Sequence, residues 1–158
     1  MRLAETQALT NQHAEAQAAY AAFLEKFPES RWQRNAQFGL AFAMENSGDS
    51  EKAIPEYQKL LSEKKVDLWT VRSRFQVGEY YFNLQQYAKA VAEFVNVEIS
   101  YKKYPSWQAK SILEIARVLL AQKKTEEAKQ RFKDVITRYP KEKAAVVAKQ
   151  YLDQRRTR

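Results

Sequence analysis

The sequence of 158 residues contains no cysteine, only three glycines and a single histidine. Without cysteine, the chain can form neither a disulfide framework nor a thiol nucleophile. No glycine-rich segment could hold a phosphate, and no group of His, Asp and Glu has the spacing of metal ligands. His13 lies in a polar stretch, where we expect an ordinary surface side chain. We therefore predict that the protein is not an enzyme and has no catalytic residues, no metal and no cofactor.

The sequence also lacks a long apolar run. No stretch is apolar enough to span a bilayer, and the first ten residues, MRLAETQALT, lack the apolar core of a secretory signal. These residues read instead as part of a helix, so we expect the chain to be a piece of a longer protein. We expect a periplasmic or other cell-envelope location if that protein is exported, with which the absence of cysteine agrees, and otherwise the cytoplasm.

Three marks recur along the chain at almost one interval. A small residue recurs after 37, 37 and 38 residues, and an aromatic residue follows it by four positions. The tryptophans Trp32, Trp69 and Trp107 are spaced by 37 and 38 residues. The small and aromatic residues are Ala16, Ala53, Ala90 and Ala128, and Tyr20, Tyr57, Phe94 and Phe132. A fixed period in this range predicts stacked supersecondary units, which present extended surfaces more often than catalytic pockets.

Each unit reads as two helices joined by a short turn. Residues 35–44 are apolar at helical spacing, residues 47–50 break the pattern, and a second helical stripe starts near Ala53. Pro55 predicts a bend or a late start of that second helix. Later turns are expected at residues 83–86 and 122–125. We predict one domain, 1–158, made of a truncated repeat (1–29), three repeats (30–66, 67–105 and 106–140) and a capping helix (141–158, helical to about 156).

These features resemble the tetratricopeptide repeat (TPR) family over nearly the whole chain. The family's small residue on the first helix corresponds to Ala41, Gly78 and Ala116, and its closing proline to Pro28, Pro105 and Pro140. The resemblance implies an all-α fold, a right-handed superhelical solenoid of antiparallel helix hairpins, with about 3.5–4 repeats before the capping helix. The units are slightly longer than the usual repeat of about 34 residues, and Lys65 replaces one closing proline.

Some phrases narrow the resemblance. The segments FLEKFPES, ISYKKYPSWQAK and VITRYPKEKAAVVAKQYLDQ are similar to bacterial repeat proteins of the cell envelope. That group includes the periplasmic partner of the Tol–Pal system and the repeat lipoprotein of the outer-membrane assembly machine. The resemblance implies a protein-binding scaffold in a bacterial envelope assembly.

In this family the first helix of each repeat lines a concave groove, which implies three rows of groove residues. Spacings of three, four and three place each row on one helix face. The rows are Asn35, Phe38, Phe42 and Glu45; Arg72, Phe75, Glu79 and Phe82; and Lys110, Leu113, Arg117 and Leu120. An aromatic centre with basic edges suits a peptide with apolar anchors and an acidic group. Alternatively, the phenylalanines pack under neighbouring repeats, and the tryptophans likewise either wedge adjacent hairpins or form a ladder that grips a peptide.

Charge is unevenly distributed along the chain. Residues 1–79 carry a net charge of −1 and residues 80–158 a net charge of +9, which together give +8. The basic half is either a solvated surface or a binding site for an anionic partner. Among anionic partners, nucleic acid is the least favoured, because no nucleic-acid-binding motif accompanies the charge.

Two functions of different classes follow from the sequence. The first is an adaptor that binds a peptide or protein segment, with or without acidic residues, in its groove. The second is a structural module that stacks through its repeat ends into a homo-oligomer.

Overall fold

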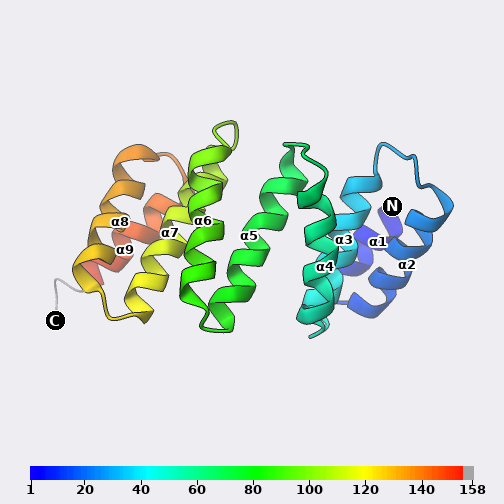
Figure 1. Cartoon of the computed structure of the whole chain (residues 1–158), viewed down its shortest axis with the longest axis horizontal. Helices are drawn as coiled ribbons and strands as arrows, with labels where there is room; N and C mark the ends of the chain where they lie inside the picture. Colours follow the sequence, from blue (N-terminus) through cyan, green and yellow to red (C-terminus); the bar gives the residue numbers. More distant parts are fainter. Residues whose placement is uncertain (155–158) are drawn as a thin grey trace. The chain divides into compact units, whose positions relative to one another are not determined.

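A computed structural model describes residues 1–154, and all regular secondary structure in that range is helical (Figure 1). Nine helices follow one another there: α1 (Arg2–Leu9), α2 (His13–Lys26), α3 (Gln33–Asn46), α4 (Ser50–Ser62), α5 (Leu68–Asn83), α6 (Tyr87–Ser100), α7 (Pro105–Ala121), α8 (Thr125–Arg138) and α9 (Lys143–Gln154). None of these helices has the length and apolar character that crossing a membrane requires. The all-α fold of helical hairpins predicted from the sequence is confirmed.

The chain forms two compact units, Met1–Ser73 and Arg74–Arg158, with the boundary inside α5. In the first unit, α1 packs against α2 and α3, and α3 also packs against α2 and α4. In the second unit, α7 packs against α6, α8 and α9, and α8 also packs against α9. Neighbouring helices within each unit run in alternating directions (Figure 1), so each unit is built from antiparallel hairpins.

The predicted helices agree with the observed ones to within a few residues, with two points to note. Helix α4 begins at Ser50 and continues through Pro55, so a late start at the proline is wrong; a bend there stays a prediction. The predicted closing helix reached residue 156, and its last two residues lie outside the described part of the chain.

The turn inside each hairpin has one repeated backbone geometry. The first helix ends at a residue with a left-handed backbone, and the next residue donates its N–H to a carbonyl five positions earlier, as in a Schellman motif. The left-handed residues are Asn11 (φ 59°), Gly48 (φ 94°), Gln85 (φ 57°) and Lys123 (φ 62°). The four closing N···O distances are all 2.9 Å, in the pairs Gln12–Gln7, Asp49–Met44, Gln86–Tyr81 and Lys124–Leu119. The sequence period therefore reappears as a period in backbone conformation, although glycine occupies only one of the four positions.

The recurring small and aromatic residues form the cores of both units. Every one of the eight is buried. In the first unit Tyr20 lies so close to α3 that a Cβ on Gly39 would be 2.4 Å from its Cζ atom, and in the second unit a Cβ on Gly78 would be 2.6 Å from Cε1 of Phe94. Small side chains therefore allow these helices to cross closely.

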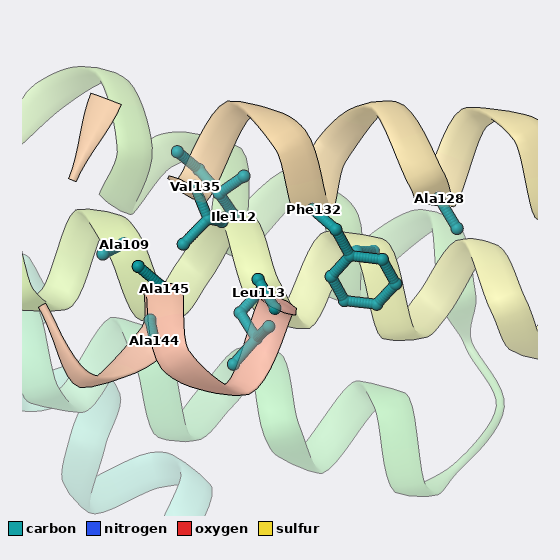
Figure 2. Packing of buried hydrophobic residues seen from close by; sticks show 10 residues of the cluster. Ala109, Ile112, Leu113, Ala128, Phe132, Val135, Ala144 and Ala145 are labelled. Carbon is teal, nitrogen blue, oxygen red and sulfur yellow. The ribbon is translucent and has the colours of Figure 1, made fainter. Parts of the chain in front are cut away.

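The second unit has an extended apolar core between α7, α8 and α9. Figure 2 shows side chains of the three helices, among them Ile112, Phe132 and Ala145, meeting in this core. Phe132 also stacks on Tyr151 of α9, with ring centroids 4.9 Å apart. Helix α9 thus covers apolar surface of the preceding hairpin, as a capping helix would.

Polar bonds link the helices around these cores. The buried guanidinium of Arg34 on α3 forms ion pairs with Glu63 and Asp67. Asp67 also accepts the backbone N–H groups of Trp69 and Thr70, each at 3.0 Å, at the start of α5. Burial raises the pKa of Asp67, but the hydrogen bonds from Arg34 and Thr70 outweigh it, so the pKa lies below its usual value. This carboxylate both begins α5 and ties it to α3.

The left-handed residue in each turn leads to a test of stability. A side chain at Lys123 strains the backbone, so Lys123→Gly should raise the free energy of unfolding by about 0.5–1 kcal/mol. Lys124→Gly is the matched control: it removes the same charge one residue later, where φ is −86°, and should not stabilise the protein. Urea unfolding followed by circular dichroism measures both, and equal changes in the two variants would contradict the backbone explanation.

Candidate functional site

A hollow in the first unit brings together four of the predicted groove residues. Asn35, Phe38 and Phe42 reach it from α3, and Arg72 reaches it from α5. The hollow encloses about 350 Å³ and is lined by Glu5, Ala8, Leu9, Tyr20, Asn35, Phe38, Gly39, Phe42, Trp69 and Arg72. Glu45, the fourth residue of the predicted α3 row, instead accepts a hydrogen bond from the Tyr57 hydroxyl at 2.7 Å.

The shape of the hollow follows from the spacing of residues along α3. Asn35, Phe38 and Phe42 are three and four positions apart and therefore lie on one helix face. Gly39 lies beside them, and its missing side chain leaves the space that the Tyr20 ring of α2 occupies. The hollow is thus lined by residues of α1, α2, α3 and α5.

The hollow is lined by the aromatic rings of Tyr20, Phe38, Phe42 and Trp69. The Phe38 ring lies 5.9 Å from Phe42, 5.6 Å from Trp69 and 5.5 Å from Tyr57, measured between ring centroids. Phe38 is buried, whereas Phe42 and Trp69 are half-buried. Phe38 therefore forms the floor of the hollow, and the other two rings offer surface to a ligand.

Few polar groups converge on this apolar wall. The Arg72 guanidinium lies 4.1 Å above the Phe38 ring centroid and 5.4 Å from that of Trp69. Burial lowers the pKa of Arg72 below its usual value. Asn35 donates a hydrogen bond to Oε1 of Glu5, 3.1 Å away. Burial, reinforced by the charge of Glu5, raises the pKa of Tyr20.

In the second unit, the predicted row residues divide between core and surface. Phe75 is buried, with its ring 5.4 Å from Phe94 and 5.2 Å from Trp107, and Leu113 is buried in the core of α7, α8 and α9, against which Leu120 packs. The cations lie over rings that are partly open to solvent: Lys110 is 4.3 Å from the centroid of Trp107, and Arg117 is 5.4 Å from that of Phe82.

A buried carboxylate that the sequence reasoning missed lies beside this surface. Glu114 on α7 accepts a hydrogen bond from Nη1 of Arg117 at 2.5 Å. Burial is the largest effect on its pKa and the neighbouring Glu79 adds to it, so that, despite Arg117, the pKa rises to about 8. The three-residue spacing of Glu114 and Arg117 was a signal that could have found the pair.

The tryptophans do not share one environment. Trp69 packs on Phe38 and Trp107 on Phe75, at matching positions of successive repeats. Trp32, in contrast, is 46% exposed, with the Arg31 guanidinium 5.0 Å from its ring centroid. It lines a second hollow of about 370 Å³ with Met1, Arg2, Glu5 and Arg31. Trp69 and Trp107 thus each pack on a phenylalanine of the preceding repeat, whereas Trp32 contacts Arg31.

The described residues include no group of three or more His, Cys, Asp and Glu side chains that could hold a metal ion. Chemically, the hollow offers aromatic faces, one cation, one carboxylate and one amide. This combination can bind and orient a ligand, but it contains no nucleophile paired with a base.

Comparison with known proteins gives the same fold. The family model of the tetratricopeptide repeat matches residues 1–30, 35–63 and 110–142. The solved structure of pilF from Pseudomonas aeruginosa has a TM-score of 0.75 and 19% identity, covering 99% of this chain and 67% of its own. A kinesin light chain from Podospora anserina with nearly identical TPR-like repeats has a TM-score of 0.73 and 18% identity, covering 93% and 78%. No curated protein matches in sequence.

The raised pKa of Glu114 makes a prediction about pH. Between about pH 4.5 and 8 the folded protein keeps a proton that the unfolded chain releases, so this group makes stability fall as pH rises through that window. In Glu114→Gln this contribution is absent, so the variant should gain melting temperature relative to wild type at pH 8 but not at pH 4.5. The exposed carboxylate Glu127 supplies the control: Glu127→Gln should follow the wild-type pH profile. A constant difference between Glu114→Gln and wild type across the window would contradict the assignment.

Proposed function

The chain belongs to the tetratricopeptide repeat family, and we propose that it is an adaptor that binds a segment of another protein in the hollow of its first unit. Proteins of this fold act as scaffolds for protein–protein interaction, and the hollow is the feature that supports such a role here. We propose further that residues 1–158 form one repeat domain.

The observation that carries the proposal is the composition of the hollow. Its volume of about 350 Å³ is at the lower end of ligand sites, which are mostly apolar with a few placed polar groups. Half-buried aromatic rings such as Phe42 and Trp69 supply large contact area with little side-chain entropy to lose. A protruding apolar side chain of a peptide would fill the hollow, while the neighbouring polar groups would orient its backbone.

We assign the second unit a contact surface of its own. Phe82, Lys110 and Arg117 are its open aromatic and cationic groups, and Glu79 belongs to the same predicted row. The net charge of +9 on residues 80–158 would attract a partner with acidic segments. Phe75 and Leu113 would support this surface from below rather than touch the partner.

The compartment is part of the proposal. The segments around Pro28, Pro105 and Pro140 resemble those of bacterial envelope proteins, and one similar solved structure comes from the bacterium Pseudomonas aeruginosa. We therefore propose a role in a bacterial envelope assembly, on the periplasmic side.

Self-assembly is the second candidate, and one observation favours it. Leu3 and Leu9 on α1 are 67% and 85% exposed, and a second copy of the chain would cover these apolar side chains. The two functions differ in what they require of these leucines, because only Leu9 lines the hollow.

Matched substitutions on α1 test the adaptor function. Leu9→Asp puts a charge into the apolar hollow at a well-exposed position, so folding should be preserved while the partner is bound at least about tenfold more weakly. Leu3→Asp makes the same change on the same helix outside the hollow and should bind like wild type. The partner is identified by affinity capture from envelope and cytosolic extracts, and the purified partner is then titrated by calorimetry.

The contrary outcomes are specific. A partner bound equally well by Leu9→Asp and wild type would remove the hollow from the proposal. Sedimentation velocity decides the alternative function: a dimer that both Leu3→Asp and Leu9→Asp dissociate would establish assembly through α1. Salt-labile capture of mixed polyanions alone would show that the basic half binds by charge and would overturn the adaptor function.

A further inference from the structure

Arg72 differs from the other buried or half-buried arginines of the described residues. Arg34, Arg74, Arg117 and Arg131 each form an ion pair with a carboxylate of their own unit. Arg72 is half-buried, and within the described part of the chain no carboxylate pairs with it. A charge removed from water is ordinarily paired, because leaving it unpaired is costly. Among the buried or half-buried arginines of residues 1–154, Arg72 is thus the one without an ion pair.

The pKa values show the same contrast. Arg34 and Arg74 are also penalised by burial, but their carboxylate partners and hydrogen bonds raise the pKa overall. For Arg72 burial is the dominant effect, and only the weaker influence of Tyr57 and Tyr20 opposes it. The folded protein therefore holds Arg72 without the compensation that its other arginines receive.

Aromatic faces hold this cation in place. The guanidinium lies over Phe38 and close to Trp69, an arrangement that attracts a cation electrostatically without using its N–H groups as hydrogen-bond donors. Arg72 also lines the hollow, so an incoming group can reach it. A carboxylate matches the fork of a guanidinium and can accept two parallel hydrogen bonds from it.

We propose that Arg72 is the specificity-determining residue of the hollow and receives a side-chain carboxylate of a bound peptide, next to an apolar side chain that fills the hollow. The inference rests on the proposed peptide-binding function and specifies its ligand: an internal Asp or Glu close in sequence to a large apolar residue.

The charge balance of the hollow favours a carboxylate over a phosphate group. Glu5 also lines the hollow, where it is hydrogen-bonded to Asn35. A phosphorylated side chain carries a charge of about −1.5 to −2, so Glu5 would repel it more strongly than a carboxylate with a single charge. A hollow that contains one cation and one anion therefore suits a singly charged ligand.

A peptide selection tests this ligand class. Random peptides fused to the display scaffold at both ends, so that the ligand cannot be a free terminus, are selected against the full chain. We expect the enriched sequences to contain Asp or Glu near a large apolar residue and to lose binding to Leu9→Asp. Replacing the acidic residue by its amide should weaken binding to wild type by about tenfold, as for loss of one partner of a charge-assisted hydrogen bond.

The decisive comparison uses Arg72→Gln. This variant should bind the acidic peptide and its amide equally, whereas Arg31→Gln, which removes an arginine stacked on Trp32 outside the hollow, should still prefer the acidic peptide about tenfold. Arg72→Lys keeps the charge without the fork and should retain part of the preference. Circular dichroism establishes that each variant is folded.

Each other outcome overturns the inference in a recognisable way. Leu9-dependent peptides with no acidic preference, or an acidic preference that Arg72→Gln keeps, would remove the role of Arg72 and leave the peptide-binding function intact. Equal weakening of both peptides in Arg72→Gln would make Arg72 a support for the aromatic wall only. No Leu9-dependent peptide at all would overturn the peptide-binding function as well. Self-association altered by Arg72→Gln would instead place a second copy of the chain in the hollow.

Discussion

The close approach of aromatic rings to very small residues sets the geometry of both units. Gly39 faces Tyr20 and Gly78 faces Phe94 at distances that no Cβ could share with the present ring positions. The cost of glycine inside a helix, about 1 kcal/mol relative to alanine, is offset by the burial of a whole aromatic side chain. Asn35, Phe38 and Phe42 are also on α3. The close crossing of α2 and α3 at Gly39 therefore also positions these side chains relative to Tyr20 in the hollow.

The fold was predictable because one period governs sequence, packing and backbone together. Small residues, aromatic residues and left-handed turn residues all recur at 37 or 38 positions, so each repeat supports the assignment of the others. The left-handed positions were less evident, because Asn11, Gln85 and Lys123 occupy places where glycine would be the usual signal. At these positions the hydrogen bond that closes the Schellman motif outweighs the preference of a residue with a side chain for a right-handed backbone.

The residues of the candidate site could be predicted only in part, for reasons that the contacts explain. Helical spacing placed Asn35, Phe38 and Phe42 on one face, but spacing alone does not distinguish Phe38, which lies under Trp69, from Phe42, which remains accessible. Glu5, Leu9 and Tyr20 belong to the preceding hairpin, and their place in the hollow depends on how α1 and α2 pack on α3. The repeat rule failed for Trp32, because Met1 occupies the register position that Phe38 and Phe75 hold for the later tryptophans.

Arg34 and Arg72 serve different purposes in the first unit, and the groups that each guanidinium contacts show the difference. Arg34 has carboxylates on both sides and joins α3 to the start of α5, so its charge is used within the fold. Arg72, about one turn from that junction along α5, has ring faces where Arg34 has carboxylates. Rings hold a guanidinium in position without using its hydrogen-bonding capacity, so a ligand carboxylate would meet a cation that is already oriented. Such pre-organisation reduces the ordering cost of binding, which is why an arginine held by aromatic rings is better suited to a ligand than one held by a salt bridge.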